Sequence, residues 1–148
     1  MSVSLAAILS RVRAVVAAVV PTTDKADRFV LVGRDLGLDV SPDTQHRAFE
    51  VVPLGVPTMT RTMAGISSAQ FAGGFAVQVR YDAGADRPDA EALALEDAES
   101  LTFAIELDPS YPAGTRAVER RGAGQFGFDE AGFAILRLEF AATYERTF

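Results

Sequence analysis

Phe133-Ala-Ile-Leu-Arg-Leu-Glu-Phe-Ala-Ala-Thr-Tyr144 alternates in side-chain character for longer than any other part of the chain. Successive residues of a β-strand point to opposite faces of its sheet. One face of this strand would therefore enter the core, and the other would be solvated or paired. The expected core face carries Leu136, Leu138, Phe140, Ala142 and Tyr144, and the opposite face carries Ile135, Arg137, Glu139, Ala141 and Thr143.

A strand of this length needs a partner, because an isolated strand is at best marginally stable in water. The best candidate is Phe75-Ala-Val-Gln-Val-Arg-Tyr81, which alternates in the same way. The clearest helix of the second half of the chain, residues 88–107, lies between these two segments. We therefore expect a sheet with this helix laid across it.

Two helices are expected, one at residues 4–20 and one at residues 88–107. The first has apolar residues at three- and four-residue steps and offers Ser2 or Ser4 as its N-cap. The second begins with Pro88 and carries acids in its first turn, where the helix dipole favours them. Asp97 lies near the edge of its apolar stripe, so we predict a position at the rim of the core.

Acidic residues cluster on this second helix. A solvated helix face is the usual meaning of such a cluster, and a surface that faces DNA or a basic partner is the alternative. The candidates for an acidic channel lining or a solvated face are Glu91, Glu96, Asp97 and Glu99.

Shorter strands are expected at residues 28–32, 47–52 and 115–121. The glycine-rich residues 122–132 then join two strands, which indicates a hairpin with a long or bulged tip. Phe126 and Phe128 would be exposed aromatics at that tip and are candidates for a partner contact.

Residues 54–74 are rich in small side chains and show no clean periodicity. Connections of this length are uncommon in compact domains unless they are functional. We expect a long loop or a hairpin arm that is ordered by contact, although a loop draped over the surface fits the sequence equally well. The contact residues of such an arm would be Thr58, Met59, Arg61 and Met63.

These elements predict one α+β domain over residues 1–148. We expect a mixed or mostly antiparallel sheet of about four to five strands with two main helices packed on it. A long loop or hairpin arm occupies residues 54–74, and the closing strand occupies residues 133–146. As a long strand close to the chain end, this last element is also a candidate subunit edge, with contacts at Arg137, Glu139 and Phe148.

Composition narrows the possible chemistry. The chain has no cysteine and a single histidine, His46, so no familiar zinc site can be assembled. No convergent acid, base and nucleophile set is evident, and we expect neither catalysis nor a cofactor. Twenty acidic against fourteen basic residues give a net charge of −6, which disfavours tight nucleic-acid binding. The apolar N-terminal segment is interrupted by Arg11 and Arg13, so we expect neither a signal peptide nor a membrane span.

The order of the expected elements resembles that of the small tail terminator and tail-completion proteins of long-tailed bacteriophages and gene transfer agents. The resemblance rests on residues 5–19, on residues 75–81 leading into the helix at residues 88–107, and on the LEFAATYER-containing segment at residues 134–146. It is a resemblance of order, spacing and size, without a signature residue.

The resemblance implies a structural virion protein, assembled in the host cytoplasm, that acts by assembly and not by catalysis. Its subunits would form a homo-oligomeric ring, six in number, that caps the tail tube and joins it to the head connector or head-closure protein. DNA would pass through the ring without specific binding. A head-closure or other neck component is the near alternative. A small α+β binding domain or enzyme subunit is an alternative of another class, which a pocket with convergent polar groups and a perturbed ionisable residue would support.

Overall fold

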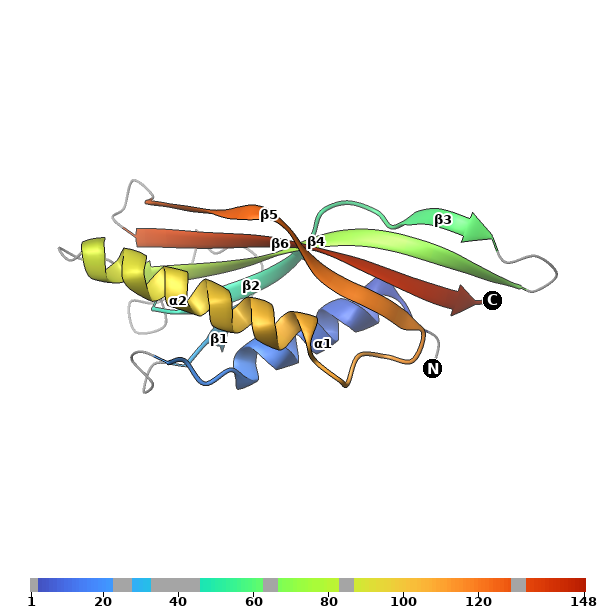
Figure 1. Ribbon diagram of the computed structural model, residues 1–148, viewed down its shortest axis with the longest axis horizontal. Coiled ribbons are helices and arrows are strands. Elements are labelled where there is room, and N and C mark those ends of the chain that lie inside the picture. The colour runs from blue at the N-terminus through green and yellow to red at the C-terminus, as the bar shows by residue number, and fades with distance from the viewer. Residues whose placement is uncertain (1–2, 23–27, 33–45, 63–66, 83–86, 129–132) are drawn as a thin grey trace.

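The computed structural model describes residues 3–22, 28–32, 46–62, 67–82, 87–128 and 133–148. Within these residues, two helices lie on one face of a sheet of six strands. Every strand pairing is antiparallel except that of β1 with β2. The α+β class and the mostly antiparallel sheet are therefore confirmed, and the sheet is slightly larger than expected (Figure 1).

The centre of the sheet is the pair formed by β4 (Ser68–Asp82) and β6 (Phe133–Thr147). Phe75 lies opposite Phe140, and their rings stack with centroids 5.3 Å apart. Both alternating segments point their apolar faces toward the helices, which confirms the predicted pairing. The buried residues of these two faces include Phe75, Val77, Val79, Tyr81, Leu136, Leu138, Phe140, Ala142 and Tyr144.

Strands follow the order β1 (Val30–Leu31), β2 (Ala48–Pro53), β4, β6 and β5 (Thr115–Phe128). β6 therefore lies inside the sheet along most of its length, and the predicted edge position is wrong there. The reason is the β5–β6 hairpin, which folds β5 back along the outer side of β6 and makes β5 the edge strand. Residues 145–147 pair with β4 alone and extend past the pairing with β5.

Helix α1 (Leu5–Ala18) packs along the sheet through its apolar stripe. Of the two predicted caps, Ser4 takes the position, because its Oγ accepts a hydrogen bond from the backbone N–H of Ala7 at 3.1 Å. Ser2 lies outside the described residues. The buried stripe comprises Leu5, Ile8, Leu9, Val12, Val15 and Val16.

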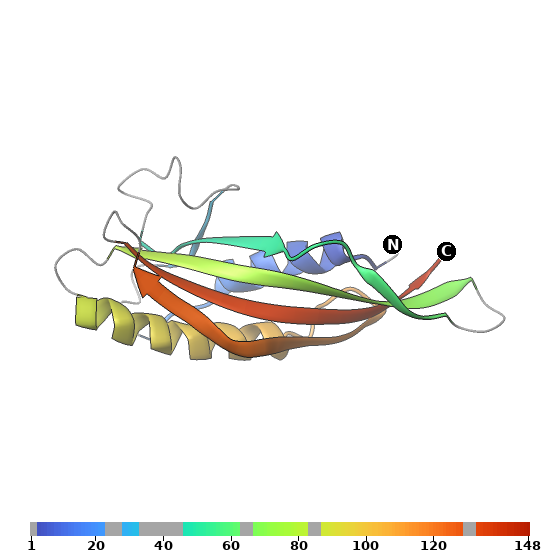
Figure 2. The same ribbon diagram turned by 90° about the horizontal axis from the view of Figure 1, so that it is seen from above.

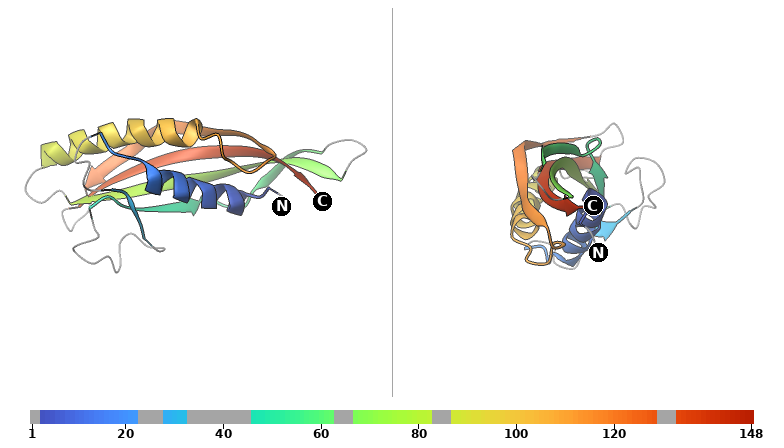
Figure 3. Two further views of the ribbon diagram at one scale, coloured as in Figure 1. Left: turned by 90° about the horizontal axis from the view of Figure 1, so that it is seen from below. Right: turned by 90° about the vertical axis from the view of Figure 1, so that its right-hand side faces the viewer.

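Helix α2 (Arg87–Glu106) lies beside α1 on the same face of the sheet, as the view from below shows (Figure 3). Ala94 and Ala98 face the core, where their small side chains permit a close approach to the sheet. The backbone N–H of Arg120 in β5 donates to Oε1 of Glu106 at 3.0 Å, which ties the helix end to the edge strand.

An ion pair connects α1 to the segment that follows α2. Arg11 of α1 donates from Nε and Nη2 to both carboxylate oxygens of Asp108, at 2.8 and 2.7 Å. This bidentate contact holds the pKa of Asp108 below its ordinary value. Arg13 of α1 donates to the carbonyl of Val51 in β2 at 3.0 Å. The two arginine side chains therefore attach α1 to β2 and to the segment after α2 within the same subunit.

A hairpin arm extends the sheet at one end. β3 (Thr58–Thr62) pairs with the first residues of β4, and the last residues of β6 lie on the other side of β4. This three-stranded part, hereafter the arm, projects beyond both helices (Figure 2). The hairpin interpretation of residues 54–74 is therefore right, but residues 68–74 belong to β4 and not to a loop. Met63 lies outside the described residues.

β5 runs through the glycine-rich segment. The register against β6 breaks between Arg121 and Gln125 and then resumes to Phe128. Gly122 and Gly124 within the break have φ values of +69° and +80°, which suit glycine. The predicted hairpin between these two strands is confirmed, but residues 122–128 belong to β5, where they form a bulge, and not to the hairpin tip. Residues 129–132, which join β5 to β6, lie outside the described residues.

Candidate functional site

The arm carries an exposed apolar surface. All five residues of β3 are exposed, including the predicted contact residues Thr58, Met59 and Arg61. Met59 lies directly opposite Phe71, which in turn lies opposite Tyr144, so these three side chains share the face of the sheet that the helices cover elsewhere. Helix α1 begins beside this part of the face, where its first residue, Leu5, contacts Tyr144, which is 3% exposed. Phe71 is only partly buried, and Met59 is exposed.

Aromatic contacts organise this surface. The Phe71 ring stacks on Tyr144 with centroids 5.7 Å apart and meets the Phe148 ring at 6.0 Å. Phe148 is nevertheless 69% exposed, and Met59 is 56% exposed. The guanidinium carbon of Arg146 lies 5.1 Å from the centre of the Phe148 ring. We call this set the arm patch: Met59, Phe71, Tyr144, Arg146 and Phe148.

A second exposed surface lies on the outer side of α2. Leu95 and Phe103 are 55% and 69% exposed, and Glu99 lies midway between them at four-residue spacing. We call Leu95, Glu99 and Phe103 the α2 stripe. Glu91 and Glu96 are exposed beside it. Whether these acids line a channel stays a prediction.

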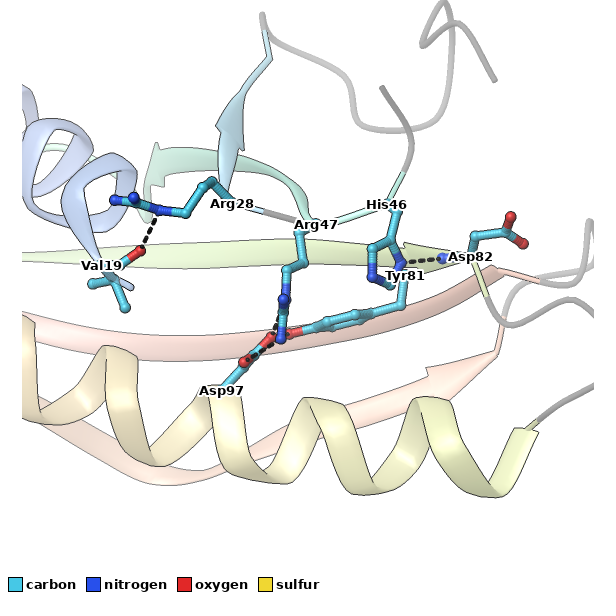
Figure 4. Close-up of polar contacts among 7 residues, drawn as sticks. All are labelled: Val19, Arg28, His46, Arg47, Tyr81, Asp82 and Asp97. Carbon is cyan, nitrogen blue, oxygen red and sulfur yellow. Dashed lines mark hydrogen bonds and ion pairs between the residues drawn. The ribbon is translucent and has the colours of Figure 1, made fainter. Parts of the chain in front are cut away.

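Asp97, by contrast, lies in the core, and its predicted rim position is wrong. The residue is 1% exposed and accepts hydrogen bonds from Arg47 Nε at 2.9 Å, Arg47 Nη2 at 3.0 Å and the Tyr81 hydroxyl at 2.8 Å. Figure 4 shows the three side chains converging from β4, from α2 and from the residue before β2. Burial is tolerated because a cation and a hydroxyl satisfy the carboxylate.

Burial sets the electrostatics of this cluster. Loss of solvent raises the pKa of Asp97, while the hydrogen bonds from Arg47 and Tyr81 act in the opposite direction. Burial also raises the pKa of Tyr81 well above its ordinary value, with the Asp97 charge adding to the effect. The Tyr81 hydroxyl therefore stays protonated and remains a donor. This geometry holds β2, β4 and α2 together and presents no solvent-facing reactive group.

Arg47 adopts an unusual backbone conformation to reach Asp97. Its φ is +56°, in the left-handed region that few residues other than glycine occupy. The guanidinium carbon also lies 5.5 Å from the centre of the Phe29 ring. His46 next to it accepts a hydrogen bond at Nδ1 from the backbone N–H of Asp82, at 3.4 Å. The lone histidine is thus engaged at the sheet end (Figure 4).

The two predicted tip aromatics lie on the edge strand instead. Phe126 faces Leu136 across the ladder and packs against the core, and its ring meets that of Phe128 at 5.4 Å. Phe128 is partly exposed. An open depression of about 490 Å³ runs along this edge, lined by Gln78, Gln125, Phe126, Gly127, Phe128, Ile135 and Arg137.

Arg137 and Glu139 lie on the face of the sheet that points away from the helices. Arg137 Nε donates to Glu139 Oε1 at 3.3 Å, and both side chains are partly exposed. They belong to β6 in the sheet interior, so a neighbour could meet them only face-on. Neither lies near the arm patch residue Phe148, so the structure does not bring the predicted β6 contacts together.

Familiar metal sites and membrane spans are absent from the described part of the chain. There, no group of histidine and acidic side chains could hold a metal ion. The helices α1 and α2 are also too short or too polar to cross a bilayer.

No protein-family model matches the sequence, and no curated protein sequence matches it. Function is therefore inferred from the residues and their geometry.

Proposed function

We propose that this protein is a tail terminator of a long-tailed phage or gene transfer agent. Its subunits form a ring, of six copies as the resemblance implies, on the head-proximal end of the tail tube. The ring stops tube growth and joins the tube to the head connector. The observation that carries the proposal is the arm, a three-stranded extension of the sheet that projects beyond the helices with exposed apolar side chains.

Exposed apolar surface favours the assembly of subunits. Contiguous apolar patches on a small domain usually mark a contact with another molecule, because burying them removes apolar area from water. The arm patch groups exposed Met59 and Phe148 with Phe71. The α2 stripe exposes Leu95 and Phe103 on either side of its glutamate, and the two surfaces belong to different parts of the molecule. A ring subunit needs two different surfaces, one for each neighbour, so this arrangement supports a closed head-to-tail assembly.

The charge of the chain suits the passage of DNA. A net charge of −6 leaves little basic surface to neutralise phosphates, and exposed acids on α2 repel them. A ring with this composition would let DNA slide without holding it.

An enzyme subunit is less well supported by the geometry. The buried acid Asp97 is occupied by Arg47 and Tyr81 and does not line the depression along β5. A smaller depression of about 240 Å³ is lined by Glu106, Asp108, Tyr111 and Arg116 among others. Its perturbed acid, Asp108, is occupied by the bidentate contact with Arg11.

The first experiment is native mass spectrometry of the purified protein together with negative-stain electron microscopy. We expect a closed ring of one stoichiometry with a central opening. A protein that stays monomeric at its highest soluble concentration would contradict the ring.

A second measurement separates a tail terminator from a head-closure protein. In a virion-producing strain that lacks the gene, loss of a terminator gives abnormally long tails, because nothing stops tube growth. Loss of a head-closure protein instead gives tails of normal length that are not joined to heads. Normal, joined virions would contradict both roles.

A further inference from the structure

We infer that the arm patch of one subunit docks on the α2 stripe of the next subunit, with Arg146 paired to Glu99. This contact rests on the proposed ring and names the two surfaces that build it. The occupant of both surfaces is thus a second copy of this chain.

The two surfaces match in chemistry. Each has an apolar part, the rings of Phe71 and Phe148 on the arm and the side chains of Leu95 and Phe103 on the helix. Each also has a central charge, and the two charges are opposite, Arg146 on the arm and Glu99 on the helix. An apolar contact with one opposite-charge pair at its centre fixes both affinity and register.

The charged groups of the two surfaces are available. Arg146 is partly exposed, and its guanidinium has no ion-pair partner among the described residues. Glu99 is exposed, and the described part of the chain gives it no ion-pair partner. Pairing would bring these two unpaired charges of opposite sign together.

One chain cannot make this contact with itself. The arm projects past the helices at one end of the molecule, and α2 extends toward the other end (Figures 1 and 2). The surfaces also differ from each other, so the contact is heterologous and passes from subunit to subunit. Such a contact closes into a ring when the rotation that relates one subunit to the next divides a full turn into a whole number of steps. Docking on the α2 stripe would place Glu99 in the interface and remove it from any channel.

A charge exchange tests the pairing. Glu99→Arg and Arg146→Glu each place like charges in contact, so we expect each to weaken ring association at least ~10-fold on dilution. Glu99→Arg combined with Arg146→Glu restores an opposite pair and should recover most of the lost association. The readout is the ring fraction against protein concentration by native mass spectrometry, with circular dichroism to confirm that each variant is folded.

Glu119→Arg is the matched control. It makes the same charge change on an exposed residue of β5, whose contact with Arg121 at 3.6 Å is too exposed to matter for stability. Association should be unchanged.

The outcomes distinguish the contact from the ring. A wild-type ring that both single variants leave intact would overturn the contact and leave the ring standing. Single variants that disrupt the ring without rescue in the double variant would overturn the pairing of Arg146 with Glu99. A wild-type monomer would overturn the ring, and the contact with it.

Discussion

Among single residues, the cluster of Arg47, Asp97 and Tyr81 constrains the core most strongly. Removing two charges from water costs several kcal/mol each, and their attraction offsets that cost only when geometry and hydrogen bonds are good. Here the bidentate contact and the tyrosine hydroxyl provide both. The net stabilisation is then small, but the loss of one partner leaves the other charge buried and unpaired.

We therefore predict that Asp97→Asn lowers the free energy of unfolding by about 3 kcal/mol, and Arg47→Met by a similar amount. The double variant should cost much less than the sum, because no uncompensated charge remains. Urea denaturation followed by circular dichroism measures all three values. Additive losses would contradict the coupling.

The sequence held part of this information. Asp97 lies four residues from both Leu93 and Leu101, so it falls on the buried stripe of the helix. Helical periodicity alone could have indicated its burial. The partners could not be found in this way, because they lie 50 and 16 residues away in sequence and meet Asp97 only in the folded chain.

Among the elements, β5 shows how a local signal can mislead. Glycines at a strand end usually mark a turn, and the pattern at residues 122–127 favoured a hairpin tip. In the structure, two positive φ values let the strand bulge and then rejoin its partner, so the turn comes later. The long alternation of β4 and β6 was a more reliable signal, since strict alternation of apolar and polar residues is characteristic of a half-buried strand.

The bulge gives a matched pair of substitutions. Gly122→Ala meets only backbone strain, since nothing lies within 4 Å of the added carbon, and should cost about 1 kcal/mol. In Gly124→Ala the added carbon would also lie 3.1 Å from the Arg137 carbonyl oxygen and 3.1 Å from Leu138 Cδ2. We expect it to cost about 1 kcal/mol more. Chemical denaturation of both variants checks the order, and equal losses would contradict the packing argument.

For the whole molecule, the net charge follows directly from the sequence, because it depends only on composition. The two proposed interaction surfaces include Met59 and Phe148, which the sequence indicated as contact candidates, and Glu99, which it indicated as part of a channel lining or a solvated face. Phe71, Arg146 and the exposed Leu95 and Phe103 were not predicted. The exposure and the neighbours of each of these residues depend on the strand pairing or on which side of α2 faces solvent. Sequence alone could not place the arm beyond the body.

We predict that the proposed ring does not retain duplex DNA, even at low ionic strength where electrostatic attraction is strongest. The net charge of −6 leaves too few phosphate contacts to hold the duplex. Filter binding or an electrophoretic shift across a salt series measures this. Salt-sensitive retention of DNA would contradict passive passage.

The continuity of β4 has a mechanical consequence. One strand runs from the arm into the body and faces β6 without interruption from Ser68 to Asp82. Hydrogen bonds in an antiparallel ladder lie across the strands, so a pull along the arm loads them in shear. The load is shared along the ladder instead of opening the bonds one at a time. Tension applied to the arm is thereby carried into the same strands that form the core.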